Sequence, residues 1–471
     1  MENDKKIILV NPWIHDFSAH DLWLKPLGLL YVASHLENQG FKVQLIDCLD
    51  YNKTPRPYGC SKFHSEEITK PCHFQNIPRK YKRYGMPPAV FTKLLMGIND
   101  ASPDNLPLFI GVTSMMTYWH QGVAETIKYI KQVFAETPVV LGGVYATLCY
   151  EHALKNSGAD YVIKGPGQEA ILNLACKLSP VNRPTDQLTN RPTNYPSYHL
   201  YNNPQSIAML TSKGCPFRCS YCASSSLYTN FSQRPPDEVI GEIEYYQKDL
   251  GVTDIAFYDD ALLVNPVRSE HGKDNNRFGN FNISVSDASN GVNAESHIHP
   301  ILDGIIQRGL NKQVRFHTPN GLHIRYIDKP LAQKLYQANF KTIRLGFESL
   351  EDPKTSKDQL IMVIAYLKEA GFTNENIGVY VLMGLPGQDL AEVDRTIEFV
   401  HKCGAQVRIS QYSPVPGSSD FIKLLPQYPE LASEPLLHNK SIYYCHAKDA
   451  KFNEFETLKL KAKQLNADIT G

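Results

Sequence analysis

The sequence predicts an α/β protein with two large domains: a doubly wound parallel-sheet domain, then a partial (β/α)6 barrel with a small C-terminal helical tail. Three observations predict this class. The chain has 471 residues, too many for one ordinary core. Strand and helix signals alternate in two separate runs. Between them, residues 179–205 are rich in Pro, Asn and Thr and lack a clear period, which indicates a linker or an extended crossing segment. We therefore expect a first domain at 1–180, a linker at 181–205, a barrel at 206–425 and a helical segment at 426–471.

The strands of the first run are apolar throughout. This pattern is typical of a parallel sheet covered by helices on both faces, a Rossmann-like arrangement. Pro26 near the start and Gly40 just past the end mark the boundaries of the first helix. A long Pro- and Tyr-rich excursion, residues 51–88, follows the second strand. The expected strands are 7–10, 43–46, 108–112, 139–141 and 161–163, and the expected helices are 26–39, 122–134, 147–156 and 169–178.

The second run contains six strand signals with helices between them, which makes three-quarters of a TIM-type (β/α) barrel. Residues 271–293 break the rhythm after the second strand and are dense in Gly, Asn, Ser and Asp, so they are expected to form a mobile loop and a candidate lid or substrate contact. A Lys-rich helix is expected at 452–466. The expected strands are 207–211, 254–257, 314–317, 342–345, 378–382 and 406–409, and the expected helices are 237–250, 297–308, 330–338, 356–370 and 390–403.

Charge and hydropathy argue against two broad classes of function. Lys plus Arg equals Asp plus Glu at 48 each, whereas a general nucleic-acid binder has a basic excess. The short basic run Arg79–Arg83 is interpreted as solvated surface. No segment reaches about 18 consecutive apolar residues, so neither a membrane span nor a signal peptide is expected. The cytoplasm is the expected compartment, where the 10 cysteines would be reduced thiols, metal ligands or catalysts.

A CxxxCxxC cluster follows the first barrel strand and carries the strongest chemical signal. Cys215, Cys219 and Cys222 come directly after Gly214, which permits a tight backbone turn. Three thiolates at this spacing can ligate three corners of an iron–sulfur cubane, leaving one iron open for a substrate or cosubstrate. A zinc site is the alternative, but structural zinc favours four ligands in CxxC pairs, and the sequence has no second CxxC.

This motif, with Tyr221 immediately before its last cysteine, resembles that of the radical S-adenosylmethionine (SAM) superfamily. In that superfamily the cluster binds the amino and carboxyl groups of SAM at its open iron, and electron transfer splits the sulfonium to give a 5′-deoxyadenosyl radical. The resemblance implies a [4Fe–4S] cluster, SAM, and an electron donor such as flavodoxin or ferredoxin. It also implies a partial (β/α)6 barrel, the fold that the strand and helix pattern predicts independently.

Polar, Gly and Pro residues gather where the predicted barrel strands end, which is where such barrels do their chemistry. Two adjacent carboxylates after the second strand are costly unless used, although they could instead cap the next segment. Glu348 follows the fourth strand, where the resemblance places a ligand-binding acid; a surface acid is the alternative. The third and fifth strands end in Asn-Gly and Gly-rich loops, which could be simple turns or could let the backbone approach adenine. The candidates for SAM binding are Tyr221, Asp259, Asp260, Asn320, Glu348 and Gly384.

Two strand ends of the first domain resemble those of a cobalamin-binding domain. Thr113 and Ser114 follow the third strand. Gly142 and Gly143 follow the fourth, where paired glycines let a bulky ligand lie against the backbone at the carboxyl edge of the sheet. These four residues are the candidate cobalamin contacts. The order of the domains, with segments such as 26–29 and 164–169, extends the resemblance to the cobalamin-binding radical SAM group over nearly the whole chain.

One motif of cobalamin domains is missing. Those that ligate cobalt from below with a histidine carry DxHxxG after the first strand, and residues 11–20 lack it. If cobalamin binds, we therefore expect its dimethylbenzimidazole tail to be displaced without a protein histidine in its place. The alternative is that the domain serves as a scaffold or substrate platform.

Three functions follow from these resemblances. The leading hypothesis is an enzyme that forms a carbon radical on a small-molecule or peptide substrate and, with cobalamin, transfers a methyl group to it. The first alternative is radical cyclisation or rearrangement without methylation. The second is a cluster-bearing binding or electron-transfer protein that does not cleave SAM. Methylthiolation of tRNA is disfavoured, because the extra N-terminal cluster cysteines and basic surface expected for it are not evident.

Other histidines and cysteines carry weaker signals. Two Cys and two His in the excursion could form a second metal site, but their spacing matches no familiar zinc module, and an ordered loop with incidental Cys and His is the alternative. These residues are Cys60, His64, Cys72 and His73. His317 and His323 are interpreted as packing or hydrogen-bonded residues.

Overall fold

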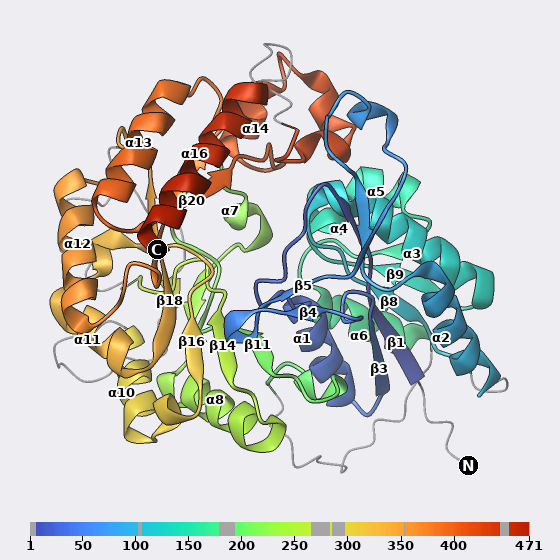
Figure 1. Ribbon diagram of the computed structural model, residues 1–471. Coiled ribbons are helices and arrows are strands. Elements are labelled where there is room, and N and C mark those ends of the chain that lie inside the picture. The colour runs from blue at the N-terminus through green and yellow to red at the C-terminus, as the bar shows by residue number, and fades with distance from the viewer. Residues whose placement is uncertain are drawn as a thin grey trace. The chain divides into compact units, whose positions relative to one another are not determined.

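The chain folds into two compact units, each built around its own parallel sheet (Figure 1). A computed structural model describes residues 6–101, 106–178, 194–264, 283–284, 297–352, 355–442 and 452–470. The first unit consists of Met1–Pro204 together with a short later segment, Pro429–Asn439. The second consists of Gln205–Tyr428 and Lys440–Gly471.

The sheet of the first unit has five parallel strands and confirms the predicted doubly wound domain. Its order is β10-β9-β8-β1-β3, so the strand order reverses between β1 and β8. In open α/β sheets, ligands bind at the carboxyl ends of the strands near such a reversal. The strands are β1 (Lys6–Asn11), β3 (Lys42–Asp47), β8 (Ile110–Val112), β9 (Val139–Leu141) and β10 (Tyr161–Val162).

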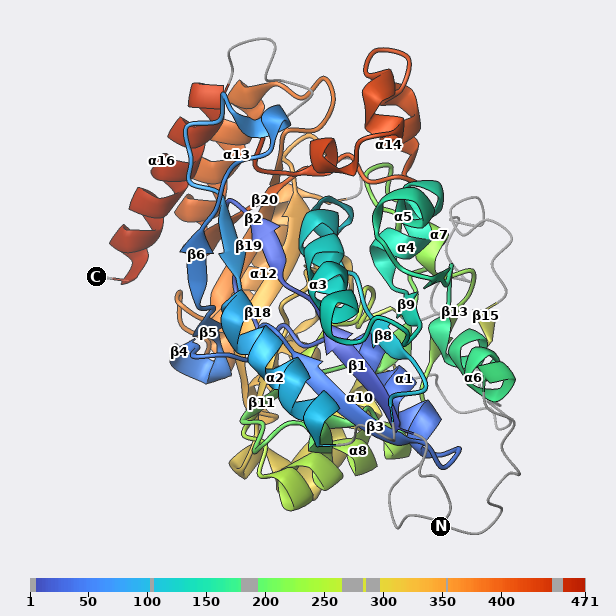
Figure 2. The same ribbon diagram turned by 90° about the vertical axis from the view of Figure 1, so that its right-hand side faces the viewer.

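Both faces of this sheet are buried. Ile7 and Leu9 pack with α1 (Leu27–Glu37) and α6 (Gly167–Leu178). Their neighbours Ile8 and Val10 point the other way and pack with α2 (Pro88–Asp100) and α3 (His120–Val133), which lie over the sheet in Figure 2. Because successive strand residues face opposite sides, burial on both faces requires the continuous apolar runs seen in the sequence.

Several elements of the first unit differ from the prediction. Helix α2 was not expected, and the single helix expected at 147–156 is two short ones, α4 (Val144–Leu148) and α5 (Tyr150–Asn156). Within the excursion, β7 pairs with β2 on one side and with β6 on the other in a small antiparallel sheet, and β4 pairs with β5. These strands are β2 (Ile14–Asp16), β4 (Thr54–Pro55), β5 (Ser61–Lys62), β6 (Ser65–Glu67) and β7 (Lys82–Tyr84).

The sheet of the second unit has seven strands. Six of them are parallel in the order β11-β14-β16-β18-β19-β20, and the short β17 (Leu322–His323) pairs with β18. All six predicted strands and the five helices between them are present, which confirms the (β/α)6 pattern of an open, partial barrel. The strands are β11 (Ser206–Met209), β14 (Asp254–Phe257), β16 (Arg315–His317), β18 (Phe340–Glu348), β19 (Ile377–Met383) and β20 (Gln406–Gln411). The helices are α8 (Pro236–Leu250), α10 (Ile298–Gln307), α11 (Lys329–Gln337), α12 (Lys357–Ala370) and α13 (Leu390–Lys402).

Shorter elements complete this unit. They are β12 (Ser212–Lys213), α7 (Ser224–Leu227), β13 (Phe231–Gln233), β17 (Leu322–His323) and α14 (Ser419–Leu424). The predicted loop 271–293 lies outside the described residues, apart from β15 (Ile283–Ser284), which pairs with β13.

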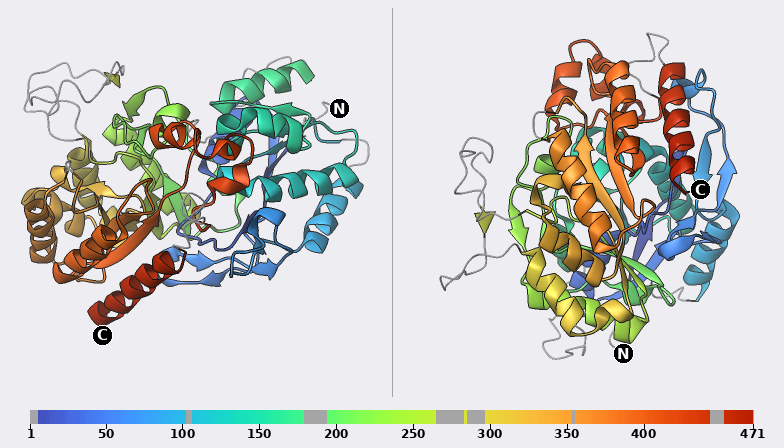
Figure 3. Two further views of the ribbon diagram at one scale, coloured as in Figure 1. Left: turned by 90° about the horizontal axis from the view of Figure 1, so that it is seen from above. Right: turned by 60° about the vertical axis from the view of Figure 1, so that its left-hand side comes forward.

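The predicted tail helix is present as α16 (Phe452–Thr470), and it covers the end of the sheet. It lies along α13 and β20, as Figure 3 shows. Asn466 accepts a hydrogen bond from the Val407 backbone N–H at 2.7 Å and donates one to the Val407 carbonyl oxygen at 2.8 Å. An edge strand otherwise exposes such groups to unwanted pairing, so this helix protects β20.

Candidate functional site

The cysteine loop lies between the first barrel strand and α7. Gly214 has a φ of 77°, and a Cβ there would lie 2.5 Å from the Asn230 carbonyl oxygen, so the turn requires glycine as predicted. Cys215, Cys219 and Cys222 are free thiols. The Cys222 N–H donates to the Cys219 carbonyl oxygen at 3.1 Å, which closes the loop on itself. The structure therefore places all three predicted cluster ligands on one tight loop.

These thiols suit a cationic group. Burial raises the pKa of Cys215 to about 12, and the nearby Asp260 carboxylate acts in the same direction. The pKa of Cys222 is also raised, mainly by burial. Cys215 and Cys219 are partly buried and Cys222 is exposed, so a metal can reach all three. Thiols with a raised pKa ionise readily when a metal supplies positive charge. The donor set thus fits an iron–sulfur cluster bound by three thiolates.

Tyr221 and Glu348 meet beside this loop. The Tyr221 hydroxyl donates a hydrogen bond to Glu348 Oε1. Glu348 ends β18 with a φ of 68°, a left-handed conformation that is unfavourable for a glutamate. The β18–β19 pairing shifts register between Gly346 and Glu348, and this irregularity turns the acid at the strand end. The two predicted SAM contacts are therefore brought together by backbone geometry.

The two adjacent aspartates have different surroundings. Asp259 Oδ1 accepts four hydrogen bonds of 2.6–2.9 Å, two from Thr211 and two from Ser212. Burial nevertheless raises the pKa of Asp259 to about 6. Asp260 Oδ2 accepts a hydrogen bond at 2.6 Å from the hydroxyl of Ser224, two residues after the last cysteine. Asp259 thus fixes the loop that follows β11, whereas Asp260 lies with the cysteines.

Asn320 and Gly384 shape neighbouring loops at the same strand ends. The Asn320 side chain donates to the carbonyl oxygens of Tyr258 and Asp259 at 2.9 and 3.0 Å, so it holds the loop after β14. Gly384 has a φ of 94°, and its N–H donates to Gln388 Oε1 at 2.8 Å. The sequence reasoning missed Gln388, although the Gly-rich loop before it requires such a partner for its backbone.

The predicted glycine pair of the first unit lies beside Ser114. Gly143 has a φ of 97°, and a Cβ there would lie 2.3 Å from the Ser114 carbonyl oxygen, so no other residue fits. The Ser114 hydroxyl donates to the Gly142 carbonyl oxygen at 2.7 Å. Thr113 is adjacent and joins β1 through its N–H. Nothing lies within 4 Å of the Cβ position of Gly142, so a flat, bulky ligand could approach its backbone.

His15 is one of the two histidines among residues 11–20, the segment that follows β1, and it is already engaged. Its Nε2 lies 2.9 Å from Glu125 Oε2. Burial would raise the pKa of Glu125, but hydrogen bonds from His15 and Arg83 outweigh it and lower that pKa to about 2. The sequence did not predict this ion-pair group of His15, Arg83 and Glu125. We interpret His15 as a structural residue, because its imidazole is already paired with Glu125.

Two parts of the sequence match known families. Residues 209–400 match the radical SAM superfamily. Residues 95–175 match the B12 binding domain. The chain therefore contains a radical SAM domain and a B12-binding domain. The radical SAM match begins at β11 and includes the cysteine loop, and the B12-binding match includes Ser114 and Gly142.

Curated relatives are distant, and each match covers only part of both chains. The anaerobic magnesium-protoporphyrin IX monomethyl ester cyclase of Cereibacter sphaeroides is 22% identical, over 37% of this chain and 33% of its own. An uncharacterized methyltransferase of Pyrococcus horikoshii is 23% identical over 52% and 50%. The cytidylyl-2-hydroxyethylphosphonate methyltransferase of Streptomyces wedmorensis is 20% identical over 55% of each. The matched part of this chain thus spans a third to about half of each relative.

A solved structure shows the same fold. The radical SAM methyltransferase TsrM of Kitasatospora setae superposes with a TM-score of 0.61 at 16% identity, covering 90% of this chain and 76% of that one. In the described part of the chain, no helix combines the length and apolar character that a membrane crossing needs.

Proposed function

We propose that this radical SAM protein reductively cleaves SAM at a [4Fe–4S] cluster and, with cobalamin on its B12-binding domain, transfers a methyl group to a substrate. The observation that carries the first step is the cysteine loop, with Tyr221 hydrogen-bonded to the strained Glu348 beside it. The observation that supports cobalamin is the open backbone at Gly142, next to the tightly packed Gly143.

The proposed roles of the side chains follow from their positions. Cys215, Cys219 and Cys222 would hold the cluster, which supplies an electron and an open iron when bound. Glu348 would hold a donor group of SAM, since its carboxylate is presented at the strand end in a fixed conformation. Asp260 would shape the cluster's surroundings through Ser224. The backbone at Gly384 would face adenine, where the absence of a side chain permits close approach.

The reaction needs an electron from a reductant such as flavodoxin or ferredoxin. It also needs reduced thiols, in keeping with the cytoplasmic location proposed from the cysteine usage. The substrate is proposed to be a small molecule or a peptide, because the net charge of zero gives no general attraction for nucleic acid.

A second candidate is radical cyclisation without methylation, favoured by the match to a magnesium-protoporphyrin ester cyclase. The two functions differ in what becomes of SAM. Methylation of a carbon radical through cobalamin consumes one SAM as methyl donor, giving S-adenosylhomocysteine, and another as radical source, giving 5′-deoxyadenosine.

The decisive experiment is anaerobic reconstitution with iron, sulfide, cobalamin and SAM, followed by reduction and measurement of both products. Both products would support methylation. Deoxyadenosine alone would favour cyclisation or rearrangement, and neither product would leave a cluster-bearing binding protein.

The Cys219→Ala variant tests the cluster assignment within the same experiment. Loss of one of three thiolate ligands should abolish the charge-transfer absorbance of the cluster and the formation of deoxyadenosine. Cys403→Ala, at the end of α13, is the matched control and should keep both, as should Cys176→Ala in α6. A full cluster in the Cys219 variant would refute the assignment.

A further inference from the structure

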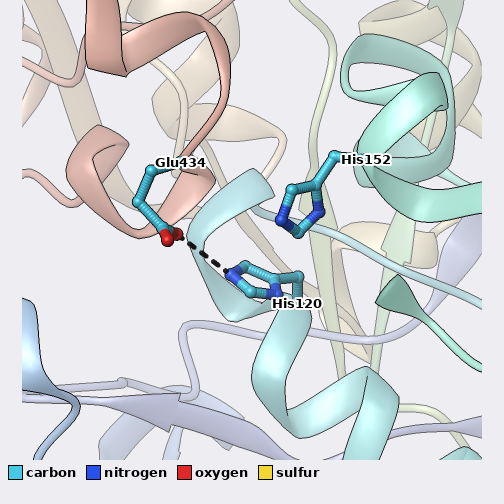
Figure 4. A group of neighbouring side chains, drawn as sticks. All are labelled: His120, His152 and Glu434. Carbon is cyan, nitrogen blue, oxygen red and sulfur yellow. Dashed lines mark ion pairs between the residues drawn. The ribbon is translucent and has the colours of Figure 1, made fainter. Parts of the chain in front are cut away.

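Three donor side chains from distant segments of the first unit converge at a point that the proposed reaction does not use. His120 begins α3, His152 lies in α5, and Glu434 precedes a short 3-10 helix within Pro429–Asn439. One donor atom of each lies within 4.8 Å of the donor atoms of the other two. Figure 4 shows the two imidazoles and the carboxylate gathered around a common point.

The spacing leaves room for a cation between the donors. His120 Nε2 lies 3.7 Å from Glu434 Oε1, which is too far for a hydrogen bond. Two ligand atoms that are each about 2.0–2.2 Å from one tetrahedral metal ion lie roughly 3–3.5 Å apart. His120 Nε2 is also buried without a hydrogen-bond partner in the described part of the chain. A buried nitrogen of this kind is costly unless a ligand satisfies it.

Tyr145 orients both imidazoles. Its hydroxyl lies 2.7 Å from His152 Nδ1, which leaves Nε2 of that ring as the available donor. Its ring stacks on His120, with the ring centroids 5.6 Å apart and the planes at 28°. Tyr145 itself is fully buried. Metal-binding histidines commonly have such an oxygen partner on the other ring nitrogen, because it fixes the tautomer and the ring orientation.

The segment that carries Glu434 is itself fixed to the first unit. His438 Nδ1 lies 3.0 Å from the Thr117 hydroxyl oxygen. The Asn439 side chain donates to Asp16 Oδ1 at 3.0 Å. Both contacts are buried, so the carboxylate of Glu434 is presented by an ordered segment and not by a freely moving chain.

We propose that His120, His152 and Glu434 bind one divalent transition-metal ion, zinc foremost, that anchors the segment Pro429–Asn439 to α3 and α5. Two imidazoles and one carboxylate form a donor set that suits zinc, whereas magnesium and calcium prefer oxygen ligands. His73 Nε2 lies 3.9 Å from Glu434 Oε2 and is a candidate fourth ligand. Of the four residues considered above as a second metal site, His73 alone is assigned here.

The test is a zinc titration of the full chain against a chromophoric chelator at neutral pH. Cys215, Cys219 and Cys222 are first changed to serine, because their thiols also bind zinc. We expect one zinc per chain with a Kd below about 1 µM. Glu434→Gln and His152→Gln should each weaken binding at least 100-fold, and Tyr145→Phe about 10-fold, as expected for loss of an outer partner.

A matched control and a second readout keep the test decisive. His401→Gln, in α13 of the second unit, should leave zinc affinity unchanged. Should a ligand variant fail to fold, the parent protein still decides the matter: zinc should raise its Tm, and EDTA should reverse the rise. Absence of zinc binding, with no response of the Tm, would overturn the proposal and leave an ion pair of His120 with Glu434. Equal affinity in folded Glu434 and His152 variants would place the ion elsewhere and would overturn the proposal as well.

Discussion

At the residue scale, Glu348 has an unfavourable left-handed backbone conformation, and its carboxylate is the proposed SAM contact. A left-handed φ costs a residue with a Cβ about 1–2 kcal/mol, and glycine would avoid that cost. Strain of this kind persists where the surrounding structure imposes it, and it is concentrated at functional sites. Here the register shift in β18 and the hydrogen bond from Tyr221 both hold the acid in place.

Exchanging Glu348 should separate stability from function. Glu348→Gly should leave the free energy of unfolding unchanged or raise it by up to about 1 kcal/mol, because the strain is relieved. It should weaken SAM binding by about 1.5–3 kcal/mol, the usual worth of a hydrogen bond to a charged group. Calorimetric SAM titration and chemical denaturation of the reconstituted protein measure both quantities.

Glu348→Gln is the matched variant, since it keeps the shape of the side chain and removes its charge. It should weaken SAM binding without altering the iron content. Unchanged SAM affinity in both variants would remove Glu348 from the site.

At the element scale, the sequence predicted the strands and helices of both sheets because their apolar periods are set locally. It placed β18 too short, at 342–345, because Lys341 and Gly346 interrupt the apolar run of Phe340–Glu348 on either side of that range. It missed α2, although Pro88 at the start and Phe91, Leu95 and Ile98 at helical spacing were a usable signal. Strand β7 of the excursion pairs with the distant β2, which no local pattern reveals.

The beginnings of β14 and β16 are joined by a buried acid, which predicts a pH effect on stability. Asp254, 1% exposed, accepts two hydrogen bonds from Arg315, at 2.7 and 2.6 Å, and lies 3.0 Å from His317 Nε2. Burial alone would raise the pKa of Asp254, but its hydrogen bonds outweigh it and lower that pKa to about 2. A lowered pKa gives stability that is present above the unfolded pKa, about 3.9, and is lost as pH falls toward 2.

Asp254→Asn should therefore lower the free energy of unfolding at neutral pH by about 2–3 kcal/mol, because it removes the charge that pairs with the partly exposed Arg315. The difference from the parent protein should shrink between about pH 4 and pH 2. Denaturant titrations across this range measure it, with the 94%-exposed Asp237→Asn as control. A difference that stays constant with pH would contradict the assignment.

The carboxyl edge of the first sheet predicts the state of bound cobalamin. His15 is committed to Glu125, and His120 is assigned to the proposed zinc site, so neither is offered to cobalt. Electron paramagnetic resonance of the protein loaded with Co(II) cobalamin should show no nitrogen superhyperfine splitting from a lower ligand. Splitting from an imidazole would contradict this prediction, and failure to bind cobalamin would leave the domain as a scaffold.

At the scale of the whole molecule, the sequence predicted both folds, but it did not show which distant side chains meet. The CxxxCxxC motif lies within one short segment, so the sequence alone could indicate an iron–sulfur site. The proposed zinc site could not be predicted in this way, because its ligands are far apart in the sequence and only the tertiary fold brings them together. They are His120, His152 and Glu434. Likewise, nothing in the composition of Pro429–Asn439 shows that it belongs to the first unit.

That segment makes a prediction about dissecting the protein. A fragment ending at residue 204 would lack the buried partners that His438 and Asn439 give to Thr117 and Asp16. Its melting temperature should rise when a synthetic peptide of residues 429–439 is added in trans, and a peptide with both of these residues changed to alanine should have no effect. A fragment that melts identically with either peptide would refute the prediction.

The reading frame therefore encodes neither unit as one continuous stretch. No single division of the gene yields two intact units, because the last segment of the first unit, Pro429–Asn439, lies between two segments of the second in the sequence. Exchange of whole domains between relatives by recombination at one point would damage this protein, so the pair is expected to be inherited together.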